Sequence, residues 1–183
     1  MIKDQIKAAI RDVKDFPKEG IVFKDITPIL ENPALTSAIT LEFVRQMKGI
    51  KVDAIMGVES RGFFWGPMIA QELGIPFIPV RKKGKLPYKT VSFQYDLEYG
   101  SAEIEVHADA IKVGANILIH DDLLATGGTA AAAAEIVLKQ KAHVAGFSFL
   151  VILDFLNGVE VLSKYNNNIT GLVNNNITGL VNY

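Results

Sequence analysis

The sequence contains no cysteine, so disulfide bonds, thiolate metal sites and a cysteine nucleophile are excluded. It also lacks the uninterrupted apolar run of about 18 residues that a membrane-spanning helix needs. Lys and Arg number 19 against 20 for Asp and Glu, a net charge of −1, whereas proteins that bind nucleic-acid phosphates normally carry a strong basic excess. The first residues are charged every few positions and do not form a secretory signal. We therefore expect a cytoplasmic protein that binds neither nucleic acid nor membrane.

What is present is the composition of an ordinary globular protein. Hydrophobic residues make up 49% and charged residues 21% of the 183 residues. A chain of this length buries roughly 70% of the surface that it exposes when unfolded, which is enough for a core without cross-links. We therefore expect one domain over residues 1–183.

The apolar pattern predicts helices that alternate with short buried strands. Residues 2–13 have apolar side chains at helical spacing and predict a helix that ends before Pro17. Asn32 and Pro33 are suited to the N-cap and first turn of a second helix, with Gly49 just beyond its end. The later predicted elements are a strand at 54–58, a helix ending at 73, strands at 75–80 and 117–119, a helix at 128–140 and a strand at 144–153. This order is typical of βαβ units and predicts an α/β fold with a parallel sheet.

Residues 81–100 interrupt this pattern. The segment begins with basic residues, Gly and Pro and continues with aromatic residues. Alternating polar and apolar residues at 91–95 and 102–106 predict a β-hairpin or a flexible loop that projects from the sheet. Long loops on a rigid α/β scaffold often act as lids.

The end of the chain contains a literal repeat. Residues 166–173 read NNNITGLV, and residues 174–181 read the same. A period of eight residues matches no solenoid module, so we interpret the repeat as a tandem duplication of a short strand and turn, or as an artefact of the sequence. Asn168 and Asn176 begin glycosylation sequons, which we expect to be empty without a secretory signal.

The strongest local signal follows the strand at 117–119. Two acids come next, and a loop of small residues then begins a helix: HDDLLATGGT. The N–H groups of residues 125–130, with the positive end of the helix, can hold a phosphate. Asp121 and Asp122 suit the paired hydroxyls of a ribose and place negative charge beside a cation that develops at its anomeric carbon. The alternative is a Gly-rich turn with an N-capping Thr and solvated acids.

This segment resembles the phosphoribosyl-pyrophosphate (PRPP) motif, residues 117–130 here, of the type I phosphoribosyltransferase family. Residues 16–30, 57–87 and 95–100 are similar, in the same order, to segments of the adenine phosphoribosyltransferases of that family. The resemblance covers residues 2 to about 165. It implies purine-salvage chemistry, in which adenine and PRPP give AMP and pyrophosphate with Mg²⁺, and a homodimer as the working unit.

The resemblance also implies a fold and a set of site residues. The fold is a mostly parallel central sheet flanked by helices, with an N-terminal hood at about 16–30 and a flexible catalytic loop at about 81–100. The ribose and 5′-phosphate of PRPP are assigned to Asp121, Asp122, Ala125, Thr126, Gly127, Gly128 and Thr129. The pyrophosphate is assigned to Glu59, Ser60, Arg61, Arg81, Lys85 and Tyr99. Adenine is assigned to Val22, Phe23, Lys24 and Leu123. Mg²⁺ is expected to bind through PRPP and water, with no direct protein ligand.

Glu98 is implied as the acid–base residue. Adenine must lose a ring proton as its N9 attacks the anomeric carbon, and a loop carboxylate near N7 can accept that proton. Tyr99 is expected to cover PRPP when the loop closes and excludes water. The alternative for Glu98 is an exposed carboxylate on a hairpin.

Three rival functions are weighed on the sequence. One is a related enzyme for xanthine, guanine or another base, since the PRPP motif is common to all. The second is a regulator that senses PRPP and binds RNA or DNA, against which the net charge of −1 and the absence of a spare domain both argue. The third is a generic nucleotide-binding domain without catalysis, against which Glu98 and a complete pyrophosphate loop argue. His120 departs from the motif, which has an apolar residue there, and we expect it to be packed or hydrogen-bonded within its strand.

Overall fold

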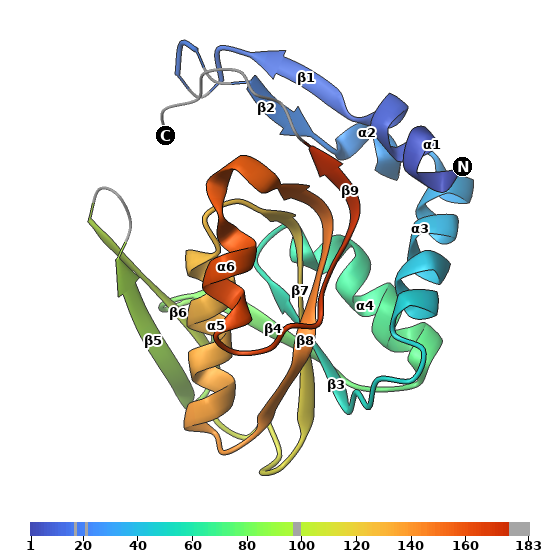
Figure 1. Cartoon of the computed structure of the whole chain (residues 1–183). Helices are drawn as coiled ribbons and strands as arrows, with labels where there is room; N and C mark the ends of the chain where they lie inside the picture. The colour runs from blue at the N-terminus through green and yellow to red at the C-terminus, as the bar shows by residue number, and fades with distance from the viewer. Residues whose placement is uncertain (17, 21, 97–99, 176–183) are drawn as a thin grey trace.

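The structure is a computed structural model that describes residues 1–16, 18–20, 22–96 and 100–175 (Figure 1). These residues form a central seven-stranded sheet with the strand order β5-β6-β4-β3-β7-β8-β9. Five strands are parallel: β3 (Ala54–Val58), β4 (Phe77–Lys82), β7 (Asn116–Leu124), β8 (His143–Leu153) and β9 (Ile169–Asn175). The hairpin strands β5 (Thr90–Asp96) and β6 (Ser101–His107) join antiparallel at one edge. The predicted α/β class with a mostly parallel sheet is confirmed.

Helices cover both faces of this sheet. One face is covered by α5 (Gly128–Lys139) and α6 (Gly158–Ser163), and a short 3-10 turn, Asp154–Leu156, precedes α6. The other face is covered by α1 (Ile2–Ala9), α2 (Thr27–Leu30), α3 (Pro33–Gln46) and α4 (Gly62–Leu73). None of the helices in the described ranges is long and apolar enough to cross a membrane.

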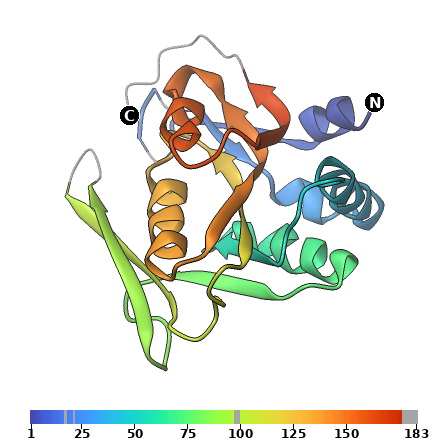
Figure 2. The same ribbon diagram turned by 60° about the horizontal axis from the view of Figure 1, so that its bottom comes forward.

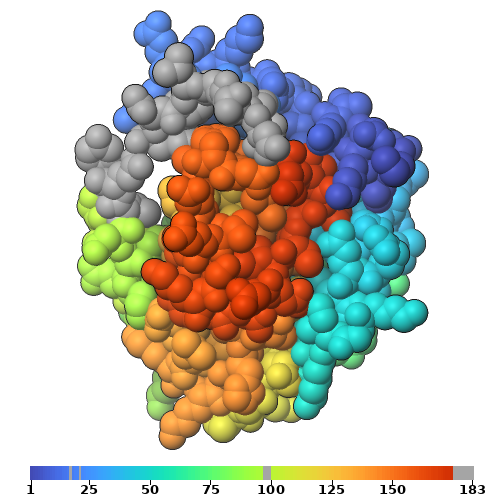
Figure 3. Space-filling view, in the orientation of Figure 1, coloured from blue at the N-terminus to red at the C-terminus, as the bar shows by residue number. Residues whose placement is uncertain are grey.

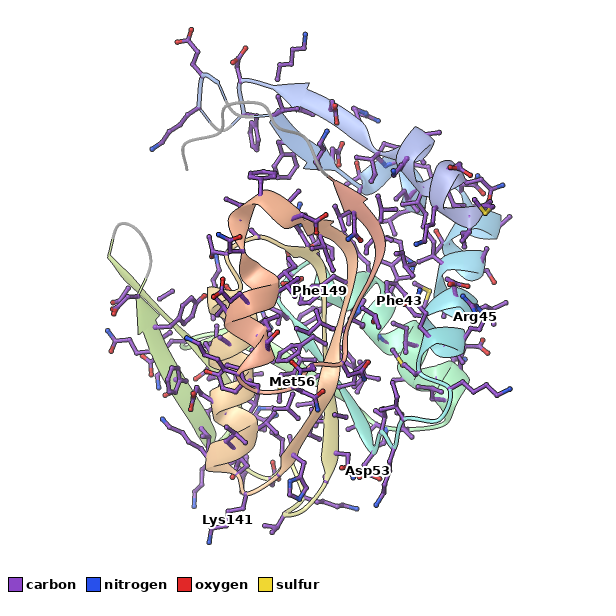
Figure 4. All side chains as sticks on the ribbon, in the orientation of Figure 1. Phe43, Arg45, Asp53, Met56, Lys141 and Phe149 are labelled. Carbon is purple, nitrogen blue, oxygen red and sulfur yellow. The ribbon has the colours of Figure 1, made fainter. Side chains whose placement is uncertain are left out.

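Two apolar layers pack against the two faces of the sheet. Figure 4 shows Met56 and Phe149 in the interior, where both belong to the layer under α5, and Phe43 in the layer under α3. Burying a side chain of this size contributes about 1.5–3 kcal/mol. By contrast, Arg45 and Lys141 point outward. The buried strands and amphipathic helices of the sequence pattern therefore meet as two layers on one sheet.

The second predicted helix and its N-cap are confirmed, while its C-cap is Met47, two residues before Gly49. The Asn32 side chain accepts a hydrogen bond from the N–H of Leu35 at 3.0 Å, and Pro33 occupies the first turn of α3. Gly49 has φ +87°, the left-handed conformation that a helix end favours. Local sequence signals were sufficient here because a cap is formed by residues adjacent in the chain.

The helix predicted over residues 2–13 is wrong in its second half. It ends at Ala9, and Arg11–Lys14 form β1, which pairs antiparallel with β2 (Val22–Asp25). Pairing with a partner strand satisfies the backbone there, and helical periodicity does not reveal such a partner. β1 and β2 form a separate two-stranded sheet at the top of the molecule in Figure 1.

The strand predicted at 117–119 is longer than expected. β7 continues to Leu124, because Asp121 pairs with Phe149 and Leu123 with Val151 on the parallel β8. The acid pair therefore lies within the strand. The first copy of the repeat supplies β9 from Ile169, Asn174 and Asn175 complete that strand, and the rest of the second copy lies outside the described residues.

Candidate active site

The centre of the site is the acid pair near the carboxyl end of β7. Asp122 is buried, and its backbone N–H donates to Asp121 Oδ1 at 2.9 Å. Burial raises the pKa of Asp121 well above its ordinary value, and the neighbouring Asp122 carboxylate raises it further. Burial also raises the pKa of Asp122, although the Arg61 guanidinium opposes this effect. A ligand that donates hydrogen bonds to these oxygens would stabilise their ionised form.

Arg61 connects the acid pair with the N-terminal hairpin. It occupies the N-cap position of α4, and its Nε lies 3.0 Å from Asp122 Oδ2. Its guanidinium carbon lies 5.2 Å from the centre of the Phe23 ring, within the range of a cation–π contact. The arrangement depends on Gly62, where a Cβ would lie only 2.8 Å from the carbonyl oxygen of His120. The beginning of α4 can therefore lie directly against β7.

The loop after β7 is shaped to bind an anion. Gly127 has φ +84°, a left-handed conformation that favours glycine, and no side chain in the described part of the chain caps α5. The N–H groups of the first turn are therefore available to a ligand at the positive end of a twelve-residue helix. Thr126 is exposed beside them, and the Thr129 hydroxyl lies 3.0 Å from that of Tyr95.

The residues assigned to pyrophosphate fall into two groups. In the first, Arg81 Nε donates to Glu59 Oε2 at 2.8 Å, and the N–H of Lys82 donates to the same oxygen at 3.0 Å. The hydrogen bond from Arg81 is the main cause that lowers the pKa of Glu59. Ser60 is exposed between Glu59 and Arg61. The structure thus brings Arg81 to the segment that begins α4.

The second group is the basic turn that contains Lys85. The N–H groups of Lys85 and Leu86 both donate to Oε1 of the buried Glu105 at 3.0 Å, while the Lys85 side chain is exposed. Burial opposes ionisation of Glu105, but hydrogen bonds, led by the N–H of Leu86, outweigh it and lower the pKa below its ordinary value. Glu105 therefore fixes the backbone of this turn.

The residues assigned to adenine lie on β2 and β7. Phe23 packs edge-on against Phe16 at 5.3 Å between ring centres, and Lys24 Nζ pairs with Asp12 on β1 at 2.6 Å. Val22 precedes them on β2, and Leu123 follows the acid pair on β7, partly buried. Glu98 and Tyr99 lie outside the described residues.

A cavity of about 400 Å³ lies between the pyrophosphate and phosphate segments. It is lined from β4, the hairpin and α5 by residues that include Glu59, Lys82, Lys83, Tyr95 and Thr129. A larger cavity, of about 750 Å³, lies between α6 and β9 and contains none of the predicted site residues. We take the smaller cavity as part of the candidate site because charged side chains and the Thr129 hydroxyl meet there.

Several residues that build the site were not predicted. Tyr95, Glu105, Gly62 and Gly158 act through contacts with segments distant in the sequence, and Gly158 lies against the phosphate loop. For Gly62 a signal was present, because it follows Arg61 directly. For Glu105 the sequence contains no such signal, since the alternation of polar and apolar residues in its strand does not distinguish a buried acid from an exposed one.

The residues present fit a magnesium ion that is carried by its substrate. Among the described residues, no group of three or more His, Cys, Asp or Glu side chains that could hold a metal ion is found. Asp121 and Asp122 supply oxygen atoms, the donors that Mg²⁺ prefers, and can accept hydrogen bonds from its water ligands.

Comparisons with known proteins identify the family of the chain. The phosphoribosyl transferase domain family matches residues 26–178. The chain is 49% identical over 173 residues to the adenine phosphoribosyltransferase of Cytophaga hutchinsonii, covering 94% of this chain and 96% of that protein. It is 50% identical over 161 residues to that of Flavobacterium johnsoniae, covering 88% and 95%.

Solved structures give the same relationship. The adenine phosphoribosyltransferase of Thermoanaerobacter pseudethanolicus superposes with a TM-score of 0.91 at 42% identity, covering 96% of this chain and all of that one. The enzyme of Saccharomyces cerevisiae, solved with adenine and an imino-altritol bisphosphate, superposes with a TM-score of 0.85 at 41% identity, covering 93% and 98%. Sequence and fold agree, and the chain belongs to the adenine phosphoribosyltransferases, the phosphoribosyltransferase family of purine salvage.

Proposed function

We propose that the carboxyl end of β7 is where this chain performs its family's reaction, the transfer of the phosphoribosyl group from PRPP to N9 of adenine. The products are AMP and pyrophosphate. The observation that carries this proposal is the acid pair, with Asp122 buried and Asp121 partly buried. Asp122 is paired with Arg61, and the N-terminus of α5, which has no side-chain cap among the described residues, follows the acid pair in the chain.

The loop and the acid pair would bind the ribose 5-phosphate part of PRPP. The N–H groups of residues 125–129, with the hydroxyls of Thr126 and Thr129, are directed to the 5′-phosphate at the positive end of α5. Asp121 and Asp122 accept hydrogen bonds from the ribose hydroxyls. Their negative charge stabilises the cation that develops at the anomeric carbon as pyrophosphate leaves.

Basic groups from two elements would bind the leaving group. Arg61 exchanges its contact with Asp122 for the pyrophosphate, and Ser60 adds a hydroxyl next to it. Arg81, fixed in position by Glu59, and Lys85, on the turn held by Glu105, bring further positive charge. Mg²⁺, bound through PRPP and water, would neutralise part of the charge that develops on the pyrophosphate oxygens.

The hood would bind adenine. Phe23 provides a face for stacking, Leu123 closes the opposite side, and the backbone of Val22 and Lys24 reads the purine edge. Among the described residues β2 pairs with β1 alone, which leaves the N–H and C=O groups along its other edge for the purine in this proposal. We infer that Glu98 accepts the ring proton of adenine and that Tyr99 covers PRPP, as the family resemblance implies.

We further propose the whole chain, residues 1–183, as one domain, because both apolar layers pack on one sheet. The working form would be a cytoplasmic homodimer, as the resemblance implies. Sedimentation of the active protein tests the dimer, and activity carried only by monomers would contradict it.

The function is tested by pyrophosphate release from PRPP and Mg²⁺ with adenine, hypoxanthine, guanine and xanthine in parallel. We expect release with adenine alone, and a large loss in Glu98→Ala. Release with another base instead would assign the chain a different substrate. Binding of PRPP without release of pyrophosphate for any base would favour the rival function, a regulator that senses PRPP.

The role of the acid pair is tested by Asp121→Asn. Because the fold raises the pKa of Asp121, its ionised form is unfavourable in the folded state, and this cost grows as the pH rises above the unfolded value near 4. We expect Asp121→Asn to reduce transfer at least about 100-fold while raising Tm at pH 7 by about 2–4 °C, and to leave Tm unchanged near pH 4.

Asp53→Asn is the matched control. The Asp53 carboxylate accepts hydrogen bonds from Asn116 at the opposite end of β7, which lower its pKa (Figure 4). This variant should lose stability at pH 7 and keep its activity. Full activity in Asp121→Asn would contradict the proposed role.

A further inference from the structure

Tyr95 forms a contact with the phosphate loop that the reaction described above does not use. It lies on β5 of the projecting hairpin, and its Oη is 3.0 Å from Oγ1 of Thr129, in the first turn of α5. Its ring also covers Gly128, where a Cβ would lie 3.7 Å from the ring carbon Cδ2. Both partners are partly buried. A residue of the hairpin is thus in direct contact with the end of α5 that faces the phosphate.

The strand that carries Tyr95 is attached to α5 at a second place. Lys139, in the last turn of α5, has its Nζ 4.7 Å from the centre of the Phe93 ring and donates to the carbonyl oxygen of Ser92 at 3.3 Å. Figures 1 and 2 both show β5 running beside α5. The position of the Tyr95 hydroxyl over Thr129 is therefore defined by the packing of two elements.

The chemistry of the two hydroxyls indicates which of them donates the hydrogen bond. A threonine hydroxyl has one proton to donate and can accept a hydrogen bond at the same time. When Tyr95 donates to Thr129, the Thr129 proton is left to donate elsewhere, and an anion at the end of α5 is the strongest acceptor there. Each hydrogen bond in such a chain polarises and strengthens the next.

We propose that Tyr95 is a positioning residue for the 5′-phosphate, which orients the Thr129 hydroxyl toward the phosphate of PRPP and of AMP. This inference rests on the proposed function in one respect, the binding of the 5′-phosphate by Thr129. Although Tyr95 lines the smaller cavity, its proposed role is through the hydrogen bond to Thr129 and not through a contact of its own with the phosphate. Its effect is therefore confined to ligands that carry the 5′-phosphate and does not extend to adenine or pyrophosphate.

The test is the Tyr95→Phe variant, which removes the hydroxyl and keeps the ring over Gly128. We expect the Kd of AMP and the KM of PRPP to rise about 5- to 20-fold, the size expected for one hydrogen bond linked to a charged group. The Kd of adenine and kcat should change less than about two-fold. Isothermal titration and steady-state kinetics measure these values.

Tyr165→Phe is the matched control. The Tyr165 hydroxyl donates to Glu135 Oε1 at 2.7 Å, farther along the same helix α5 and away from its first turn. This variant also removes one tyrosine hydroxyl bound to α5, so a general loss of helix attachment would appear in both. We expect Tyr165→Phe to bind AMP and adenine as the unmodified protein does.

The Thr129→Val background separates positioning from structure. Because Tyr95 acts through Thr129, adding Tyr95→Phe to Thr129→Val should weaken AMP binding by less than about two-fold further. Three results would overturn the inference. The first is an AMP Kd that Tyr95→Phe leaves unchanged, and the second is an equal loss of affinity for AMP and for adenine. The third is a double variant in which Tyr95→Phe weakens AMP binding as much as it does in the unmodified protein.

The outcomes also separate this inference from the proposed function. An unmodified protein that binds AMP without transferring the phosphoribosyl group overturns the proposed function alone, because the AMP affinities still report on Tyr95. An unmodified protein that does not bind AMP overturns both.

Discussion

His120 is a fully buried histidine inside an otherwise apolar part of β7. Its Nδ1 lies 2.8 Å from Ser148 Oγ on β8, and its ring packs edge-on against Phe43 at 5.0 Å between centres. It is packed and hydrogen-bonded, as its place in the strand predicts. Burial lowers its pKa to about 3, so it is neutral wherever the enzyme is expected to work.

This residue should make the fold sensitive to acid. The unfolded chain takes up a proton at His120 below about pH 6.5, and the folded chain does not until about pH 3. Its contribution to stability is present above pH 6.5 and is lost as the pH falls, by at most about 1.4 kcal/mol per unit. In His120→Leu, we expect the free energy of unfolding to fall less steeply between pH 6 and 4.5, as measured by urea denaturation.

The control for this prediction also removes the Ser148 hydroxyl, which His120→Leu leaves buried without its hydrogen-bond partner. His120→Leu combined with Ser148→Ala should show the same flattened pH dependence, with higher stability than His120→Leu alone. A slope equal to that of the unmodified protein would show that His120 does not cause the acid sensitivity.

The residue types proposed for the site could be named from the sequence, but the contacts between them could not. The acids and small residues of HDDLLATGGT indicate a ribose phosphate site because their chemistry is local to one strand and one loop. The pairs Arg61–Asp122 and Arg81–Glu59 join residues 61 and 22 positions apart. Only the fold brings such residues together.

At the scale of elements, α6 supports the phosphate loop from outside. A Cβ at Gly158, the first residue of α6, would overlap the carbonyl oxygen of Ala125, and one at Gly127 would lie 3.0 Å from the carbonyl oxygen of Gly158. Figure 3 shows α6 at the surface, near the centre of this face of the molecule. The two backbones are in direct contact, so the shape of the loop depends on α6.

We predict that Gly158→Ala displaces the phosphate loop. The KM of PRPP should rise about ten-fold or more, while the KM of adenine stays within about two-fold, since the added Cβ would meet Leu124 and Ala125 of the loop segment. Steady-state kinetics with each substrate varied in turn measures this difference.

Gly146→Ala on β8 is the comparison. A Cβ there would lie 2.6 Å from the carbonyl oxygen of Asn168, an equally severe contact that is remote from the loop. It should lower Tm without changing the KM of PRPP. Parallel increases of both KM values in Gly158→Ala would indicate a general effect on folding instead.

Helices and strands were predicted well where the hydrophobic pattern is long. They were predicted poorly where pairing with another strand determines the secondary structure. The periodicity of α4 and of β8 gives their type and most of their length. Residues 11–14 read as helix but form β1, because the pairing of Val13 with Phe23 outweighs a weak local preference.

At the scale of the whole molecule, the eight-residue repeat gives the chain two identical candidates for its edge strand. The repeat length is even, so exchanging one copy for the other keeps every side chain on the same face of the sheet. In the structure the first copy supplies most of β9, with Leu172 and Val173 buried against β8 and the helices.

Deleting residues 174–181 should therefore have little effect. The remaining chain keeps the whole first copy, followed by Asn and Tyr, and deleting the first copy instead would give the identical sequence. We expect Tm to stay within about 2 °C, and transfer activity within about two-fold, of the full chain.

Deleting both copies, residues 166–181, is the control. It removes β9 and exposes one edge of β8, with the loss of two buried aliphatic side chains worth about 1.5–3 kcal/mol each. Tm should fall by about 10 °C or more. If deletion of one copy destabilised the fold as much as deletion of both, the copies would not be interchangeable.

The sequence by itself determined the α/β class, the order of most elements and the succession of strand, acid pair, small-residue loop and helix at residues 117–139. These features depend on periodicity, capping and turn chemistry, which act between residues close in the chain. The tertiary structure alone decided that Arg61 joins Phe23 to Asp122, that Tyr95 reaches Thr129 and that Gly158 supports the loop. Such contacts depend on how the two layers pack on the sheet, because residues far apart in sequence meet only when the whole core has formed.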